Sequence, residues 1–194
     1  MIAPTDLLWA LIGLILTIGG TFLEAFVTNP PWAWAQDGLH PHSLGTTYQI
    51  GAVLLVGCMG GRNAAAISQM AYLLLGLLWL NIFGQGGGLD YVHEPGFGYL
   101  LGFIPGAWVC GNLAFRVAVR LESLAFCCLC GLLTVHVVGL SYLAIAHSVQ
   151  WLQAPVSPLP KLMMTYSVYP LPGQLVILCA VTVISFVMRH ILFY

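Results

Sequence analysis

Charged side chains are so sparse in this sequence that water alone cannot solvate its folded surface. Five Lys or Arg and six Asp or Glu are spread over 194 residues, which is 6% of the chain, whereas 60% of the residues are hydrophobic. Soluble domains carry about 25% charged residues, because their surface must face water. Lipid must therefore cover much of this chain, and the sequence predicts an all-α membrane protein.

Apolar runs divide the chain into six candidate transmembrane helices. A helix needs about 20 residues to cross a hydrocarbon core about 30 Å thick. The runs cover residues 7–27, 47–60, 64–83, 97–117, 123–146 and 174–192. The second run is short, and Gly61-Arg62-Asn63 predicts a tight turn between it and the third. No internal repeat or change of composition interrupts the chain, so residues 1–194 are predicted to form a single transmembrane domain.

Basic residues indicate how this bundle is oriented. Four of the five lie at the ends of the second, fourth and sixth runs, on one face of the predicted bundle: Arg62, Arg116, Arg120 and Arg189. Because basic residues favour the cytoplasmic side, both termini are predicted to be cytoplasmic. The polar segment after residue 28, the glycine loop at 84–90 and the proline linker at 155–173 then face outward. Long loops at one mouth of a bundle commonly form a ligand site, although they could also be plain connectors.

Small residues predict close helix packing at two places. Gly98, Gly102 and Gly106 recur every four residues and share one helix face, where a neighbouring backbone can approach closely. Gly13 and Thr17 belong to a similar stripe on the first run. This second stripe could contact either another helix of the same chain or a partner protein.

The sequence gives no support for an enzyme, a metal site or a nucleic-acid partner. The six cysteines lie in apolar runs and are interpreted as small buried hydrophobes. Cys127, Cys128 and Cys130 point in different directions on one helix, and His136 and His147 are about three turns apart. All five are therefore interpreted as packing residues. No nucleophile–base motif is present, the glycine loop lacks the Gly-Lys-Ser/Thr ending of nucleotide sites, and no basic tract suits nucleic acid. We predict no catalytic residue and no metal ligand.

Short motifs follow one another in a specific order between residues 47 and 115. They are Tyr48-Gln49 with Val-Leu-Leu-Val-Gly at 53–57, Gly61-Arg62, Tyr-Leu-Leu-Leu-Gly at 72–76, Phe-Gly-Gln-Gly-Gly-Gly at 83–88 and Pro-Gly-Phe-Gly-Tyr-Leu-Leu-Gly-Phe at 95–103. In this pattern the chain resembles the BioY family, the biotin-binding membrane subunits (S components) of energy-coupling-factor transporters. The remainder is similar more loosely, through residues 138–144 and 171–173.

The resemblance implies a bundle of six helices with an outward-facing biotin pocket and no enzymatic step of its own. It also implies a transmembrane coupling protein and paired ATPases as partners, which supply energy from ATP, so no cofactor is expected in this chain. A multi-pass protein of a prokaryotic cell membrane follows from the same resemblance. The chain departs from the family pattern at Gln174 and Ile177, which replace an Asp and a Lys. It departs again at Gly13 and Thr17, which replace a pair of alanines that meets the coupling protein.

Biotin offers apolar rings, a ureido group that needs acceptors and a donor, and a carboxylate that needs donors or a cation. Polar side chains near the outer ends of the predicted helices are the candidates for these contacts: Gln49, Asn81, Gln85, Tyr99 and Gln174. The backbone N–H groups of Gly86 and Gly87 could add to them, since glycine lets a ligand come close. With no lysine at position 177, Lys161, His93 or Gln174 is predicted to meet the carboxylate.

Two other functions are compatible with the sequence. Gln174 and Ile177 could adapt a related S component to a different small molecule, and biotin would then show no saturable binding at micromolar concentration. A membrane scaffold without any solute would show no ligand-dependent rise in thermal stability. Direct binding of biotin to the purified protein distinguishes these functions from the first.

Overall fold

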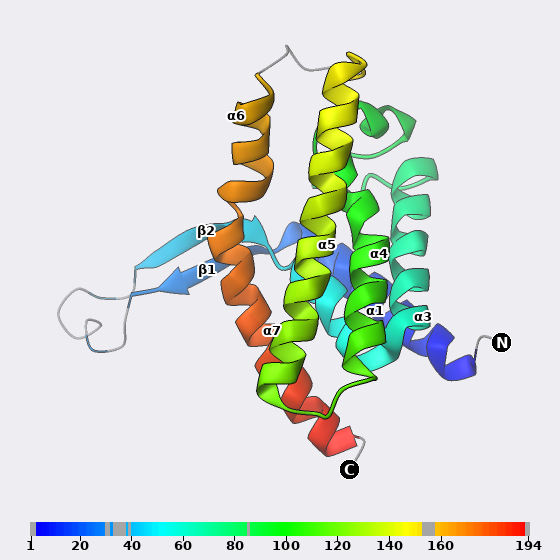
Figure 1. Cartoon of the computed structure of the whole chain (residues 1–194), viewed down its shortest axis with the longest axis vertical. Coiled ribbons are helices and arrows are strands. Elements are labelled where there is room, and N and C mark those ends of the chain that lie inside the picture. The colour runs from blue at the N-terminus through cyan, green and yellow to red at the C-terminus, as the bar shows by residue number, and fades with distance from the viewer. Residues whose placement is uncertain are drawn as a thin grey trace.

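The computed structural model describes residues 3–29, 32, 38, 40–84, 86–152 and 158–192. These residues form a mostly helical bundle with a two-stranded β-hairpin on one side (Figure 1). Among them, five segments are long and apolar enough to cross a membrane: α1 (Pro4–Phe22), α3 (Gln49–Leu78), α4 (Phe97–Ala114), α5 (Leu121–Ser148) and the run Leu159–Leu192. The prediction of a mostly helical chain with several apolar helices of membrane-spanning length is confirmed.

α3 is one helical element that folds back on itself at Gly61. Gln49 Nε2 donates to the hydroxyl of Tyr72 at 2.9 Å, although 23 positions separate the two residues. A straight helix would hold them about 35 Å apart, so the two arms, 49–60 and 62–78, run antiparallel. Gly61 has φ +77° and ψ −179°, a conformation that residues with a Cβ rarely adopt. The turn predicted at this glycine is confirmed.

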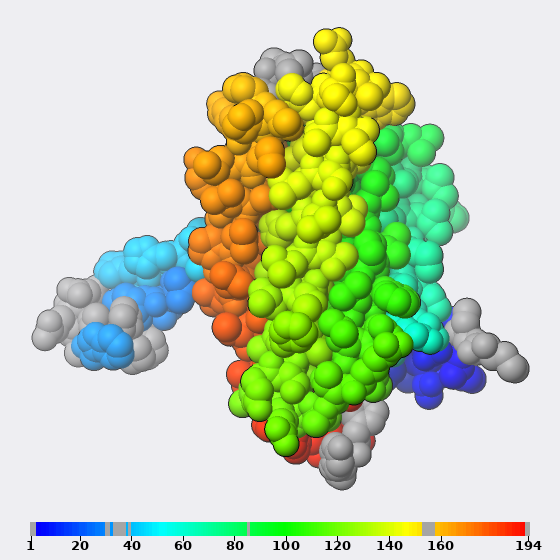
Figure 2. Space-filling model, viewed as in Figure 1, coloured from blue at the N-terminus to red at the C-terminus, as the bar shows by residue number. Residues whose placement is uncertain are grey.

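The chain between α1 and α3 forms a β-hairpin that projects sideways from the bundle (Figures 1 and 2). β1 (Glu24–Thr28) pairs antiparallel with β2 (Pro41–Thr47). The prediction of a helix over residues 7–27 in an all-α fold is wrong at this point, because hydropathy does not separate a short apolar strand from the end of a helix. The two prolines that follow also favour extended backbone before them. Glu24 accepts a hydrogen bond from Ser43 within the hairpin, so it does not lie in a membrane helix.

Two further predicted boundaries are wrong. The helix predicted over residues 64–83 ends at Leu78, because the chain leaves helical geometry there and Phe83 then forms a β-bridge with Gly86. The predicted proline linker contains helix: α6 (Leu159–Met163) continues through the π-helical turn η3 (Met164–Val168) toward α7 (Leu171–Leu192). Prolines occupy the first turns of α6 and α7, where proline is compatible with a helix.

The helices pack in chain order, α1 on α3, α3 on α4 and α4 on α5, and α7 closes the bundle against α3 and α5. In Figure 2, α5 runs along the visible face between α7 and α4. A Cβ on Gly102 would lie 2.8 Å from the carbonyl oxygen of Val135, and one on Gly106 would lie 2.9 Å from that of Gly131. The predicted close packing at these glycines is therefore confirmed, and α4 and α5 meet backbone to backbone.

The small-residue stripe of α1 faces α3 of the same chain. Thr17 is fully buried, and its hydroxyl donates to the Gly13 carbonyl at 2.8 Å and accepts from Gln69 Nε2 at 3.1 Å. A Cβ on Gly13 would collide with Val56 and Ser68, which belong to the two arms of α3. The sequence left two alternatives for this stripe, a helix of the same chain or a partner protein, and the structure shows the first. Gly13 and Thr17 are both buried, so neither is on the surface.

Candidate functional site

A cavity of about 310 Å³ opens where the start of α3 meets α4, α5 and α7. β2, the 3₁₀ turn η2 (Leu89–His93) and η3 border it. Its lining combines small, aromatic and amide side chains: Gly45, Thr46, Thr47, Gln49, Ile50, Gly84, Tyr91, Gly96, Tyr99, Leu100, Phe103, Val135, Tyr166, Pro170 and Gln174. A concave, mostly apolar space with a few placed polar groups is the usual form of a small-molecule site.

Other hollows are larger, but their linings differ from that of the 310 Å³ cavity. One of about 440 Å³ lies between α1, α3 and α7 and is lined by outward-facing apolar side chains such as Leu16 and Ile184. Another, of about 350 Å³, is lined by Arg62 and Arg116 at the turns of α3 and α4, away from the 310 Å³ cavity. We call this region the arginine end of the bundle. The 310 Å³ cavity combines aromatic walls with uncharged amides and is therefore the candidate site.

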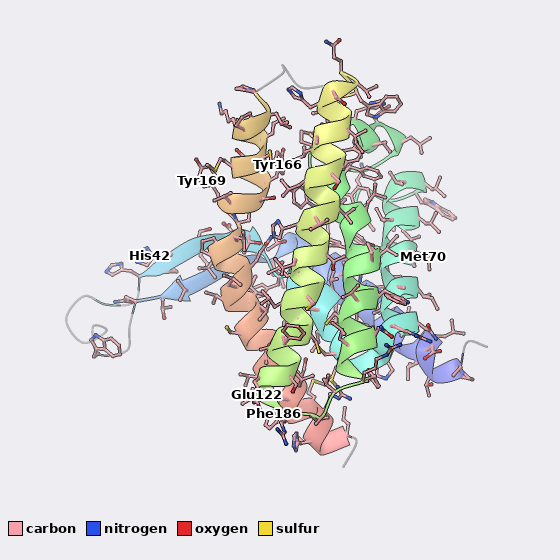
Figure 3. The ribbon with its side chains drawn as sticks, in the orientation of Figure 1. His42, Met70, Glu122, Tyr166, Tyr169 and Phe186 are labelled. Carbon is pink, nitrogen blue, oxygen red and sulfur yellow. The ribbon has the colours of Figure 1, made fainter. Side chains whose placement is uncertain are left out.

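Aromatic rings form one wall of the cavity. Tyr99 of α4 stacks on Tyr166 of η3 with ring centroids 6.2 Å apart, and Figure 3 shows Tyr166 between η3 and α5. Tyr91 of η2 lies beside Phe83, with 4.7 Å between the ring centroids. Burial raises the pKa of Tyr91 to about 12, and the nearby Glu94 and Tyr166 add to this rise. Tyr91 therefore stays an uncharged hydroxyl at neutral pH.

Four hydrogen-bonded side chains form a polar network at the cavity. His136 Nε2 lies 2.7 Å from Gln174 Oε1, and His136 Nδ1 lies 3.2 Å from Ser167 Oγ. Ser167 Oγ is in turn 2.5 Å from the hydroxyl oxygen of Tyr99. An amide oxygen only accepts hydrogen bonds, so His136 Nε2 carries a hydrogen. In a neutral imidazole Nδ1 then accepts from the Ser167 hydroxyl. The Tyr99 hydroxyl then donates to Ser167.

This network fixes which atoms of Gln174 the cavity meets. Gln174 Oε1 is engaged by His136, so Gln174 Nε2 remains as a donor that no described residue engages. Gln49 is held in the opposite sense, because its Nε2 donates to Tyr72 at 2.9 Å and its Oε1 has no partner in the described part of the chain. The two glutamines therefore offer one acceptor and one donor group to the same cavity.

One family model, described as the BioY family, matches residues 6–192. The chain belongs to the BioY family. An uncharacterized 21.2 kDa protein of Cyanophora paradoxa is 27% identical to it over 149 residues, covering 77% of this chain and 76% of that protein. "Probable biotin transporter BioY" of Lysinibacillus sphaericus is 42% identical over 108 residues, covering 55% and 54%. "Biotin transporter BioY" of Thermotoga maritima is 36% identical over 83 residues, covering 42% and 48%.

A solved structure shows the same fold as this BioY-family chain. It is the crystal structure of the S-component for biotin from an ECF-type ABC transporter. It superposes with a TM-score of 0.64 and 20% sequence identity over 95% of this chain and 88% of that chain. The two sequence relatives named as biotin transporters are matched over 54% and 48% of their own length. The resemblance that the motifs indicated is confirmed by the family match.

Three of the predicted site residues of this BioY-family chain line the cavity: Gln49, Tyr99 and Gln174. Asn81 is exposed beyond the end of α3, and Lys161 is exposed on α6. Neither of them lines the cavity. Gln85 lies outside the residues that the structure describes, although its neighbour Gly84 is part of the lining.

The rest of the glycine loop packs against the end of α3. The Gly86 N–H donates to the Phe83 carbonyl at 3.0 Å, and a Cβ on Gly87 would lie 2.8 Å from the carbonyl oxygen of Gly76. His93 Nδ1 lies 2.9 Å from the carbonyl oxygen of Trp151. Neither the two glycines nor His93 line the cavity, and the Gly86 N–H is already engaged within the chain.

Sequence reasoning missed several residues of the site. It interprets His136 as a packing residue, whereas the imidazole bonds Ser167 and Gln174. One signal was present, because a polar side chain inside a membrane helix needs a partner or a wet cavity, and His136 lies within the apolar run 123–146. Ser167 and Tyr166 fall in a segment predicted to be a linker, and no sequence pattern places them at the site.

Ile177, where the family pattern has a lysine, does not line the cavity. It lies on the 440 Å³ apolar hollow between α1, α3 and α7. Its side chain is 3% exposed, and a Cβ on Gly51 would lie 2.8 Å from Ile177 Cγ2. Position 177 therefore packs against α3, and α7 contributes its polar contact through Gln174.

Proposed function

We propose that this chain is the biotin-binding subunit of an energy-coupling-factor importer. The observation that carries the proposal is the 310 Å³ cavity of this BioY-family chain. Its aromatic walls surround one free acceptor, Gln49 Oε1, and one free donor, Gln174 Nε2. Two relatives named as biotin transporters support the same substrate. Such a subunit binds and releases biotin without a chemical step of its own.

The cavity suits the chemistry of biotin. Its volume of about 310 Å³ falls at the lower end of the range of about 300–1,000 Å³ for small-molecule pockets. The apolar rings would lie against Tyr99 and Tyr166, and a ureido N–H would donate to Gln49 Oε1. The Gln174 amide would donate to an oxygen of the ureido group or of the carboxylate. Among the described residues no Lys or Arg lines the cavity, so neutral donors would recognise the carboxylate.

In this proposal the cavity opens on the outer side of a prokaryotic cell membrane. The two arms of α3, counted separately, give six helical segments, and in this proposal both termini and the arginine end with Arg62, Arg116 and Arg189 are cytoplasmic. A transmembrane coupling protein and paired ATPases drive inward release, with ATP hydrolysed by the partners. Exposed apolar side chains of α1, including Leu11 and Ile15, offer the coupling protein a surface, since Gly13 and Thr17 are covered by α3.

A different small molecule is the second candidate substrate, and the position of Ile177 favours it. Because no lysine from α7 reaches the cavity, a neutral cyclic urea or amide would satisfy the two glutamines as well as biotin does. The uncharged amide of biotin separates the two candidates. Binding of biotinamide that is tighter than binding of biotin would favour a neutral substrate.

Calorimetric titration of biotin into the purified protein tests the proposal. We expect one saturable site and an affinity about tenfold lower in Gln174→Ala, since one hydrogen bond contributes about 1–1.5 kcal/mol. Asn81→Ala is the matched control, because Asn81 is an exposed amide outside the cavity, and its affinity should equal that of the wild type. Absence of saturable binding to the wild-type protein would overturn the proposal.

A further inference from the structure

Three cysteine thiols from three different helices converge inside the bundle. Cys58 belongs to the first arm of α3, Cys110 to α4 and Cys128 to α5, and all three are fully buried. Cys58 Sγ lies 3.7 Å from Cys110 Sγ and 3.5 Å from Cys128 Sγ, and the three sulfurs lie within 4.8 Å of one another. Sequence analysis interprets them as small buried hydrophobes because they lie in apolar runs. It does not bring them together, since 52 and 70 positions separate Cys110 and Cys128 from Cys58.

The spacing of the sulfurs suits three ligands of one metal ion. A thiolate binds a metal at about 2.3 Å, which places three sulfurs around one ion about 4 Å apart. Two of the three sulfur–sulfur distances, 3.7 and 3.5 Å, lie within about half an ångström of this spacing. Among the described residues no fourth Cys, His, Asp or Glu joins the group. Zinc usually takes four ligands, whereas Cu(I) is a soft ion that thiolates select, so three sulfurs alone favour Cu(I).

Charge near the cluster favours a negatively charged metal complex. Arg189 of α7 is 8% exposed, its Nη1 donates to the Ala114 carbonyl at 2.8 Å, and its Nε has no partner among the residues that the structure describes. Its guanidinium acts electrostatically on both Cys58 and Cys127. Ser185, one turn before Arg189, lies beside Cys58 and has a buried hydroxyl without a described partner. A buried cation is therefore available to balance thiolate charge.

Glycines allow the three sulfurs to meet. A Cβ on Gly57 would lie 3.2 Å from Cys110 Sγ, and a Cβ on Gly131 would lie 2.9 Å from Cys110 Cβ. Larger residues at these positions would separate α4 from α3 and α5. The 350 Å³ hollow at the arginine end includes Gly111, the residue after Cys110, and lies about one helical turn from Cys58.

We propose that Cys58, Cys110 and Cys128 form a binding site for one Cu(I) ion. Two of the thiols release their protons to water at the arginine end and bind as thiolates, and the third binds as a neutral thiol. The complex then carries one negative charge, which Arg189 balances. The bound ion ties α3, α4 and α5 together at the end of the bundle away from the biotin cavity.

Competition for Cu(I) with the chelator bicinchoninate tests the site in the purified, reduced protein. We expect the wild type to retain one Cu(I) per chain and to show thiolate-to-copper absorption in the ultraviolet. Cys58→Ala and Cys128→Ala should each weaken binding on the order of a hundredfold. Cys179→Ala removes an exposed thiol outside the cluster and should bind copper as the wild type does. Equal retention of Cu(I) by Cys58→Ala and the wild type would overturn the proposal.

X-ray absorption of the wild-type copper complex tests the same site without a substitution, so a variant that fails to fold does not decide the question. Three sulfur neighbours of copper are expected. A shell of nitrogen or oxygen neighbours, or no copper retained against the chelator, would overturn the proposal. Neither measurement involves biotin, so the outcome is independent of the proposed transport function.

Discussion

His136 controls which hydrogen-bonding atoms the cavity presents, although it does not line the cavity itself. Its Nε2 donates to Gln174 Oε1, and Ser167 holds the other side of the imidazole. Without this bond the Gln174 amide could rotate and offer its oxygen in place of its nitrogen. The orientation of one glutamine therefore depends on a histidine 38 positions earlier in the chain.

Replacing this histidine should weaken biotin binding. We expect His136→Ala to lower the affinity about fivefold to tenfold, because Gln174 loses the bond that orients it and such a bond contributes about 1 kcal/mol. Calorimetry at fixed pH measures the change. His147→Ala is the matched control, since His147 lies on the same helix outside the network. If His136→Ala binds biotin as tightly as the wild type, the role assigned to the histidine is wrong.

Tyr91 gives the protein a stability that depends on pH. Burial raises its pKa from an ordinary 10.0 to about 12, so the unfolded chain loses this proton at a lower pH than the folded chain. The contribution of neutral Tyr91 is therefore fully present below about pH 10 and is lost as the pH rises toward 12. Between these values the melting temperature of Tyr91→Phe should fall less steeply than that of the wild type.

Tyr169→Phe is the control for this experiment, because Tyr169 is 71% exposed and Figure 3 shows it on the outer side of η3. Its melting temperature should follow the wild type across the whole range. Superimposable pH profiles for Tyr91→Phe and the wild type would contradict the effect of burial on Tyr91.

The sequence alone could predict part of the site. Gln49, Tyr99 and Gln174 stand out because they are polar residues near the outer ends of apolar runs. Their partners could not be predicted, since Ser167 is 68 positions from Tyr99 and hydropathy does not fix how each helix is rotated about its axis. Lys161 was predicted to meet the biotin carboxylate because of its positive charge. It lies on α6, where its side chain is exposed.

At the scale of elements, backbone contact between α4 and α5 depends on Gly102. A Cβ there would meet three backbone atoms of Val135 at 2.8–3.3 Å, and backbone cannot rotate away as a side chain can. We expect Gly102→Ala to destabilise the fold by about 1–3 kcal/mol through overpacking. Thermal unfolding in detergent measures the loss as a lower melting temperature.

Gly19→Ala on α1 provides the matched control, because a Cβ there meets nothing within 4 Å. It should be neutral or slightly stabilising, since alanine is favoured over glycine in a helix by about 0.5–1 kcal/mol. Equal melting temperatures for the two alanine variants would contradict the tight α4–α5 contact.

The elements show why hydropathy predicted most, but not all, of the fold. Long apolar runs identified the membrane helices, and Gly61 marked the reversal within α3. The strand Glu24–Thr28 was hidden, because it continues the apolar run of α1 without a change of composition. The helix Leu159–Met163 was not predicted because its composition suggests a loop. Prolines usually indicate a loop, but here they fall at the first turn, where a helix accepts them.

At the scale of the whole molecule, the two ends of the bundle carry different chemistry. Uncharged amides and tyrosines surround the cavity near the start of α3. At the arginine end, Arg62 donates to Asn112 at 3.2 Å and Arg189 donates to the last carbonyl of α4 at 2.8 Å. Because a positively charged end favours the cytoplasm, this polarity supports a cavity that faces outward.

Labelling of one cavity residue on intact cells tests the central claim, an outward-facing biotin site, most directly. Thr46 of β2 lines the cavity, so Thr46→Cys is placed in a Cys179→Ser background that lacks the exposed native thiol. A membrane-impermeant maleimide should modify this cysteine from outside, and saturating biotin should slow the reaction. Labelling that requires permeabilised cells, or that proceeds at the same rate with and without biotin, would contradict the claim.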